Sequence, residues 1–137
     1  MTSRRPPYVK VCCIASIDEA RLAVSAGASA LGLVSTMPSG PGVIDERLIG
    51  EIVATVPPPV ATFLLSARQD ADALVDQHAV CRTSTLQLVD SVPASELRKL
   101  RKRIPGIKVV QVVHVSHENA LEEARVAAAF VDALLLD

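Results

Sequence analysis

The sequence contains very few aromatic residues: two Phe, one Tyr and no Trp among 137 residues. Half of the residues are nevertheless apolar, so Val, Ile, Leu and Ala must build the core. A core of this composition is typical of parallel sheets covered by Ala-rich helices and argues against a β-sandwich. The length is sufficient for one domain with a buried core.

Long runs of charge of one sign are also missing. The chain has 14 basic and 15 acidic residues, and its only basic cluster is RKLRKR at 98–103. Leu97, Leu100 and Ile104 lie in the same segment at helical spacing, so we interpret the cluster as the solvated face of a helix. A nucleic-acid binder usually carries a basic patch. The sequence therefore predicts no nucleic-acid partner.

Cysteine is scarce, and its spacing matches no common cysteine motif. The three residues Cys12, Cys13 and Cys81 form no C-x-x-C motif, and no signal-like N-terminus or long apolar run is present. These features predict a reduced, cytoplasmic protein without a membrane partner. Residues 1–7 are expected to form a disordered lead-in, and residues 8–137 the domain.

Short β-branched segments alternate with longer helical patterns along the chain. The first helix is expected to begin near Ser16 or Asp18 and to stop at Gly27. Ser91 or Ser95 is expected to cap the fourth helix. The expected strands are 8–14, 29–35, 60–66, 83–90, 108–116 and 131–137, and the later helices are 45–56, 69–80, 93–104 and 117–130.

This alternation predicts parallel strands joined by right-handed crossovers, either in a doubly wound sheet or in a (β/α)₈ barrel. No G-x-G-x-x-G follows the first strand, which argues against a dinucleotide-binding sheet. A complete barrel needs about 200 residues or more. We therefore predict an α/β fold of the TIM-barrel type, incomplete, with about six strands and five helices. The alternatives are a fragment that pairs with a second chain, or a chain that stops where a mobile loop begins.

In such a barrel, reactive side chains lie at the carboxyl ends of the strands and in the loops that follow. Few polar residues occupy these places. They are Cys12, Cys13, Ser35, Thr36, Ser39, Ser66, Gln87, Asp90, His114, Ser116, His117 and Asp137.

The adjacent Cys12 and Cys13 are expected to face opposite sides of their strand, because side chains alternate along a strand. A vicinal disulfide would be strained, so we do not expect one. A thiol and a carboxyl such as Asp137 across the barrel mouth can act as general base and general acid. From spacing alone, a buried core cysteine and a turn-capping Asp remain the simpler interpretation.

His114 and His117 are three residues apart, which raises the question of a metal site. One lies inside an expected strand and the other beyond it, with no third His or Cys nearby. Zinc sites usually have three or four protein ligands. The sequence therefore predicts no metal ligands and no metal ion.

The sequence resembles the phosphoribosylanthranilate isomerase family. The resemblance rests on KVCCI, where the family has K-[IV]-C-G, and on the AGASALGLV pattern that follows the first helix. It extends through a Pro-rich turn before the third strand, the pair Gln87-Leu88, and LLLD at the end of the sixth strand. The MPSGPG loop and the QLVD ending indicate a divergent branch.

The resemblance implies an eight-stranded barrel and an aldose–ketose isomerase of tryptophan biosynthesis. The family performs the Amadori rearrangement of N-(5-phosphoribosyl)anthranilate without cofactor. Its general base falls on Cys12 and its general acid on Asp137. Gln87, Ser39 and Asp90, at strand ends, are expected to bind this small phosphorylated substrate.

Three positions depart from the family. An Arg is usual where this chain has Pro41, a His where it has Val89, and a Gly where it has Cys13. The phosphate-binding loops, expected after the seventh and eighth strands, lie outside these residues, so the 137 residues alone are expected to be inactive. The alternatives are an isomerase of another phosphorylated aminosugar, or a non-catalytic fragment that assembles at its open edge with the rest of a barrel or a second chain.

Overall fold

The computed structural model describes residues 6–137, which form one curved sheet of six parallel strands in the order β1 to β6. The strands are β1 (Lys10–Val11), β2 (Ala30–Val34), β3 (Ala61–Ser66), β4 (Thr85–Leu88), β5 (Lys108–Val113) and β6 (Ala133–Leu136). The helices are α1 (Ile17–Ser25), α2 (Glu46–Thr55), α3 (Ala71–Cys81), α4 (Ala94–Arg103) and α5 (Ala120–Ala128).

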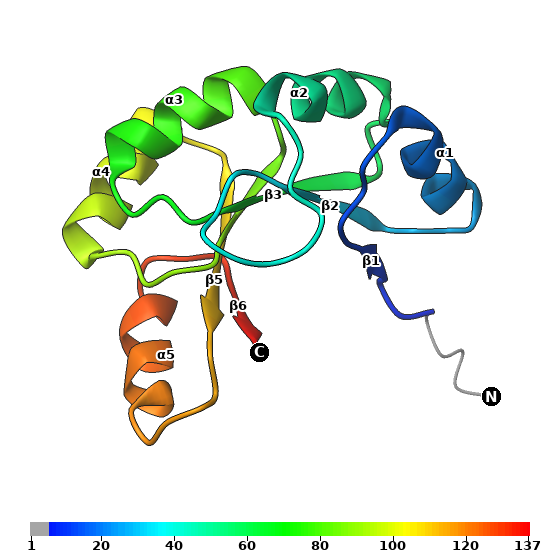
Figure 1. Ribbon diagram of the computed structural model, residues 1–137. Coiled ribbons are helices and arrows are strands. Elements are labelled where there is room, and N and C mark those ends of the chain that lie inside the picture. Colours follow the sequence, from blue (N-terminus) through cyan, green and yellow to red (C-terminus); the bar gives the residue numbers. More distant parts are fainter. Residues whose placement is uncertain (1–5) are drawn as a thin grey trace.

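The helices cover the convex side of this sheet, and α1 to α4 follow its curve as an arc (Figure 1). The other side is concave. Six neighbouring strands in sequence order, each pair parallel, form an open part of a barrel wall. The structure confirms the predicted α/β sheet of the barrel type, with six parallel strands and five helices within residues 6–137.

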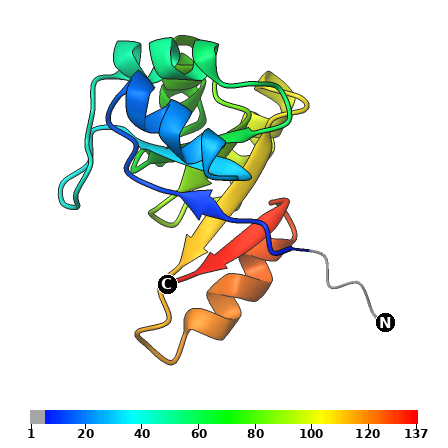
Figure 2. The ribbon, with the colours of Figure 1, turned by 90° about the vertical axis from the view of Figure 1, so that its right-hand side faces the viewer.

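The two edges of the sheet are β1 and β6. Within residues 6–137 each of them pairs with a single neighbouring strand, β2 and β5 respectively. Figure 2 looks onto the open side and shows both edge strands facing the viewer. The strand expected over 8–14 is much shorter than predicted, because regular pairing covers only Lys10 and Val11.

The core lies between the sheet and the helices. Leu31, Leu33, Leu64, Leu86 and Val109 project from the strands into this layer and are fully buried. The intervening strand residues therefore point to the concave side. Aliphatic residues dominate the core, as the scarcity of aromatic residues indicated.

The helix ends follow the expected chemistry in most places. The Ser16 hydroxyl caps α1 by accepting from the Glu19 N–H, and Asp70 caps α3 by accepting from Ala73. The predicted cap of α4 by Ser91 or Ser95 is wrong: Pro93 occupies the cap position, and α4 has no side-chain cap. Proline is tolerated at a helix start, because its fixed φ suits the first turn and its missing N–H removes no helix hydrogen bond there.

Residues 1–5 of the expected lead-in 1–7 lie outside the described residues, and residues 6 and 7 are exposed and irregular. Within residues 6–137, every helix is too short or too polar to span a membrane.

Candidate active site

A pocket of about 480 Å³ opens on the concave side at the carboxyl ends of the strands. Its walls include the inward-facing residues of four consecutive strands, namely Leu65, Gln87, Val112 and Leu135. We call it the mouth pocket. Its rim is formed by residues that follow the strands, among them Asp90, His114 and Asp137.

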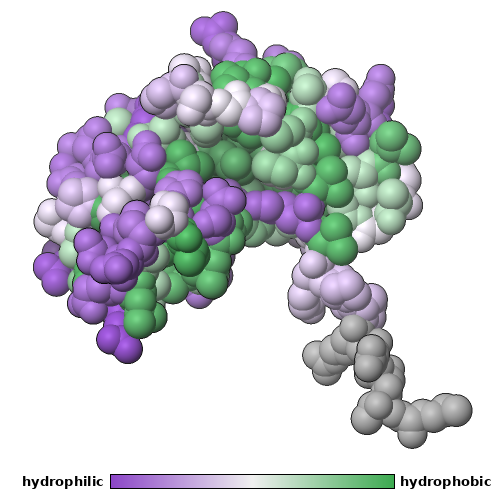
Figure 3. Space-filling view, turned by 60° about the horizontal axis from the view of Figure 1, so that its bottom comes forward, coloured by the Kyte–Doolittle hydropathy of each residue, from purple (hydrophilic) through white to green (hydrophobic). Residues whose placement is uncertain are grey.

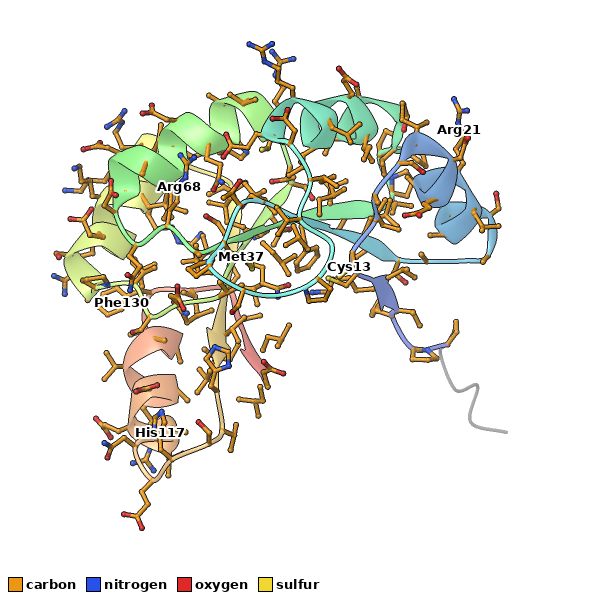
Figure 4. The ribbon with its side chains drawn as sticks, in the orientation of Figure 1. Cys13, Arg21, Met37, Arg68, His117 and Phe130 are labelled. Carbon is orange, nitrogen blue, oxygen red and sulfur yellow. The ribbon has the colours of Figure 1, made fainter. Side chains whose placement is uncertain are left out.

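The loop after β2 closes one side of the mouth pocket. Met37, Pro38 and Ser39 contribute to its lining, and a bridge between Val34 and Val43 returns the loop to the sheet. Figure 1 shows this loop passing in front of the sheet, and Figure 4 places Met37 on it. In the space-filling view, hydrophobic and hydrophilic surface both appear on this hollowed face (Figure 3).

Four of the five site residues expected from the sequence therefore meet in one place. Ser39, Gln87, Asp90 and Asp137 all line the mouth pocket. Cys12 does not line it. Together with Cys13, it lines a separate shallow groove along α1.

Cys12 nevertheless lies on the concave side of the sheet. A β-carbon built on Gly32 would approach the Cys12 sulfur to 2.7 Å, so the thiol occupies the space that the glycine leaves. Gly32 lies between Leu31 and Leu33, which point to the helices. A β-carbon at position 32 would therefore point to the concave side. The Cys12 residue as a whole is exposed.

The prediction that Cys13 faces the opposite layer is wrong. Its backbone has a φ of +60°, in the left-handed region, and this turn interrupts the strand alternation. The side chain meets the loop after β2, where its sulfur lies 3.7 Å from the Pro41 carbonyl oxygen (Figure 4). Burial raises the pKa of the Cys13 thiol, and the neighbouring Cys12 raises it further by charge and hydrogen bonding.

Lys10 contacts a residue of the mouth pocket, which the sequence interpretation did not predict. Its ammonium group donates a hydrogen bond to the Gln87 side-chain oxygen and lies 4.8 Å from the centre of the Phe63 ring. Burial lowers the pKa of Lys10, while the charge of Cys12 opposes this effect. The inward position of Lys10 on β1, two residues before Cys12, could have been found from strand alternation.

Asp137 has a partner that the sequence did not predict. Its carboxylate oxygen Oδ2 lies 3.3 Å from Nδ1 of His114. The backbone holds the two residues together, because the Asp137 N–H donates to Val113 and the Asp137 carbonyl accepts from Val115. Both side chains are more than half exposed, and both line the mouth pocket.

His114 and His117 do not converge on a common point. His117 lies 3.8 Å from Glu123 at the start of α5, well away from β5's end (Figure 4). Among residues 6–137, no three His, Cys, Asp or Glu side chains gather in a way that could hold a metal ion.

Comparison with known proteins identifies relatives along almost the whole chain. The chain is 34% identical over 125 residues to N-(5'-phosphoribosyl)anthranilate isomerase of Geobacter metallireducens, covering 91% of this chain and 60% of the relative. It is 27% identical over 129 residues to the enzyme of that name from Methanocella arvoryzae, covering 94% and 61%. The chain thus spans about three fifths of the length of these curated relatives. No family model matches it.

Solved structures give the same result. A phosphoribosyl anthranilate isomerase in complex with reduced 1-(o-carboxyphenylamino)-1-deoxyribulose 5-phosphate has a TM-score of 0.83 at 27% identity, covering 96% of this chain and 65% of that one. The phosphoribosyl anthranilate isomerase of Thermotoga maritima has a TM-score of 0.82 at 27% identity, with coverage of 96% and 62%. These matches confirm the resemblance to the family inferred from the sequence.

Proposed function

Because the chain is related in sequence and fold to the phosphoribosylanthranilate isomerase family, we propose that it carries the general base and the general acid of an aldose–ketose isomerase. The substrate is N-(5-phosphoribosyl)anthranilate, and the reaction is the Amadori rearrangement of tryptophan biosynthesis. The observation that carries the proposal is the placement of Asp137, Gln87, Ser39 and Asp90 around one pocket at the carboxyl ends of the strands.

In the proposed mechanism the Asp137 carboxyl donates its proton to the ribose ring oxygen. The bond between that oxygen and the anomeric carbon breaks, and the nitrogen lone pair forms an iminium ion. Cys12, as thiolate, then removes the proton from the neighbouring carbon, and those electrons form the enamine as the iminium is neutralised. The iminium makes this proton acidic, so a modest base suffices. Tautomerisation of the enol gives the ketose.

Gln87, Ser39 and Asp90 are proposed to bind the substrate. Gln87 is buried and is held by Lys10, so its side chain is fixed before the substrate enters. Ser39 is carried by the loop after β2, and Asp90 follows β4; both line the mouth pocket. The reaction as proposed uses no metal and no organic cofactor.

We further propose that the six strands are the front part of an eight-stranded barrel in a cytoplasmic enzyme. The matched solved structures, of which the chain covers 62–65%, support this extension. Barrels of this type bind phosphate with the loops after the last two strands. The 137 residues alone are accordingly expected to be inactive.

The proposal is tested by following the loss of substrate fluorescence in the complete protein. Cys12→Ser and Asp137→Asn should each lower kcat by at least about a hundredfold, the range expected for a general base or acid. Cys13→Ala is the matched control, since it removes the adjacent thiol but not the proposed base. Full activity in Cys12→Ser would overturn the assignment.

A second candidate is an isomerase of another phosphorylated aminosugar. The residues that line the mouth pocket include no Arg or Lys, and Pro41 and Val89 occupy positions where the family resemblance led us to expect Arg and His. Comparing turnover on a panel of phosphoribosyl amines separates the two candidates. Higher kcat/KM on a compound without the anthranilate ring would favour this one.

The third candidate is a non-catalytic fragment that assembles through its sheet edges. Its support is that β1 and β6 each have one strand partner within residues 6–137. Sedimentation of the 137-residue chain tests it directly. A stable, monodisperse monomer would contradict assembly through these edges.

A further inference from the structure

Lys10 connects strands on the concave side of the sheet that are not neighbours. Its ammonium group donates a hydrogen bond to the side-chain oxygen of Gln87 on β4 and lies 4.8 Å from the centre of the Phe63 ring on β3. Within residues 6–137 the backbone of β1 pairs with β2 alone. We propose that Lys10 is a positioning residue, which orients the Gln87 amide so that its N–H groups face the mouth pocket and bind an acceptor oxygen of the substrate; this role rests on the proposed function.

The ammonium group determines the orientation of the Gln87 amide. It carries three N–H donors and no acceptor, so the amide oxygen must be the atom that faces it. Within residues 6–137 the amide nitrogen Nε2 forms no hydrogen bond, yet every fully buried side-chain nitrogen or oxygen there has a partner. The Nε2 atom is therefore not enclosed in the core. Because Gln87 lines the mouth pocket, Nε2 is the atom that it offers to a ligand there.

Gln87 differs in burial from the other polar residues that line the mouth pocket. Its exposed fraction is 5%. The other polar lining residues are all exposed, namely Ser39, Asp90, His114 and Asp137. A hydrogen bond to a buried donor is strengthened because water competes less for it. An acceptor oxygen of a phosphorylated aminosugar is therefore the group that Gln87 is placed to bind.

The orientation of the amide matters because its two ends are nearly identical in shape. The oxygen and the nitrogen of a primary amide differ in hydrogen bonding but hardly in size. Without Lys10, a flipped Gln87 would fit the same space and present an acceptor to the mouth pocket. A substrate oxygen would then meet another oxygen. Lys10 does not line the pocket, so we expect it to influence substrate binding through Gln87.

The first test detects the contact without measuring activity. The melting temperature of the complete protein is compared for Lys10→Met in two backgrounds, native and Gln87→Glu. Glutamate at position 87 still accepts from the ammonium group, so removing Lys10 there leaves a buried carboxylate without a cation. We expect Lys10→Met to lower the melting temperature more in Gln87→Glu than in the native protein. Equal losses would overturn the proposal, because position 87 would not sense Lys10.

The second test measures KM for N-(5-phosphoribosyl)anthranilate in the complete protein. Gln87→Glu keeps the acceptor for Lys10 but replaces the N–H groups that face the pocket by an oxygen. We expect KM to rise about tenfold or more, as for the loss of one buried hydrogen bond. Lys102→Met, on the exposed face of α4, is the control and should have the native KM. A native KM in Gln87→Glu would overturn the assignment of a donor to this position.

The third test asks whether Lys10 acts through Gln87. Lys10→Met should raise KM several-fold in the native protein but no further in Gln87→Met, which has no amide to orient. An equal rise in both backgrounds would show that the charge of Lys10 acts alone, and would overturn the proposal. Burial lowers the pKa of Lys10 and the charge of Cys12 opposes this effect, so Lys10→Met also acts on the proposed base. We expect that action in kcat, in both backgrounds.

The two proposals fail in different ways. If Cys12→Ser and Asp137→Asn abolish turnover while Lys10→Met keeps the native KM, the role of Lys10 is wrong and the proposed function stands. If Cys12→Ser and Asp137→Asn both retain turnover, the proposed function is wrong. The melting temperatures then still decide whether Lys10 holds the side chain at position 87.

Discussion

The sulfur of Cys13 lies 3.7 Å from the carbonyl oxygen of Pro41, and it belongs to a residue with a φ of +60°. This contact joins the turn that carries Cys12 to the loop that closes the mouth pocket. A β-carbon at Gly42 would come within 2.6 Å of the Cys13 β-carbon, so a side chain at position 42 would collide with Cys13. The residue next to the proposed base therefore packs against the loop.

Replacing Cys13 by glycine should stabilise the protein. A side chain in the left-handed region costs about 1 kcal/mol or more, and glycine removes this cost while losing somewhat more entropy on folding. We expect the free energy of unfolding in urea to rise by up to about 1 kcal/mol. Arg82 has a φ of +55° at the end of α3, so Arg82→Gly is a matched benchmark. A destabilised Cys13→Gly beside a stabilised Arg82→Gly would mean that the Pro41 contact outweighs the strain.

Gly42→Ala should be considerably more damaging than Gly27→Ala. Both glycines have positive φ, so both substitutions introduce backbone strain of about 1 kcal/mol. At Gly27 nothing lies within 4 Å of the added carbon, whereas at Gly42 it overlaps Cys13. Thermal unfolding measures the stability difference. Equal melting temperatures for the two variants would show that the loop moves aside freely.

The three cysteines should differ in reactivity towards iodoacetamide. Cys81 is fully buried, and burial, followed by the charge of Glu46, raises the pKa of its thiol to about 12. A thiol reacts as the thiolate, so Cys81 should remain unmodified at pH 8. Exposed Cys12 should react first, and Cys13 more slowly because of its raised pKa. Peptide mass spectrometry gives the order, with urea-unfolded protein as the control in which all three react.

Most of the fold could be predicted from the sequence because hydrophobic periodicity determines it. The order of strands and helices, the parallel sheet and the aliphatic core follow from local patterns that the tertiary structure preserves. The first strand is the exception. Residues 12–14 have strand-like composition, but the turn at Cys13 ends regular pairing after Val11. No local signal distinguishes a cysteine in a left-handed turn from one in a strand.

The site could be predicted in part. Gln87, Asp90 and Asp137 were found because parallel strands bring their carboxyl ends to one edge. The pairing of His114 with Asp137 was not predicted, since it depends on how far β5 and β6 extend beside each other. The spacing of His114 and His117 raised the question of a metal site, but the sequence predicted none; His117 lies near Glu123.

The start of β6, and with it the position of Asp137, should depend on Asp132. The Asp132 carboxylate accepts from the Val109 N–H at 2.8 Å and from the Arg101 guanidinium at 2.7 Å, so it joins β5, α4 and the strand that carries Asp137. Asp132→Asn weakens both bonds. Hydrogen bonds to charged groups contribute about 1.5–3 kcal/mol, and we expect a loss in that range at pH 7.

The same variant should change the acid sensitivity of the protein. Burial raises the pKa of Asp132, but the Val109 N–H and the Arg101 charge outweigh it and hold the pKa below its ordinary value of 3.8. A lowered pKa stabilises the folded state above the unfolded-state value, and this contribution disappears as the pH falls through the folded-state pKa. The difference in the free energy of unfolding in urea between wild type and Asp132→Asn should therefore be large at pH 7 and shrink below about pH 4.

Asp72→Asn is the control, because Asp72 also pairs with two cations, Lys99 and Arg103, but lies exposed on α3. A loss in Asp72→Asn as large as that in Asp132→Asn would show that surface pairing, and not the anchoring of β6, explains the effect.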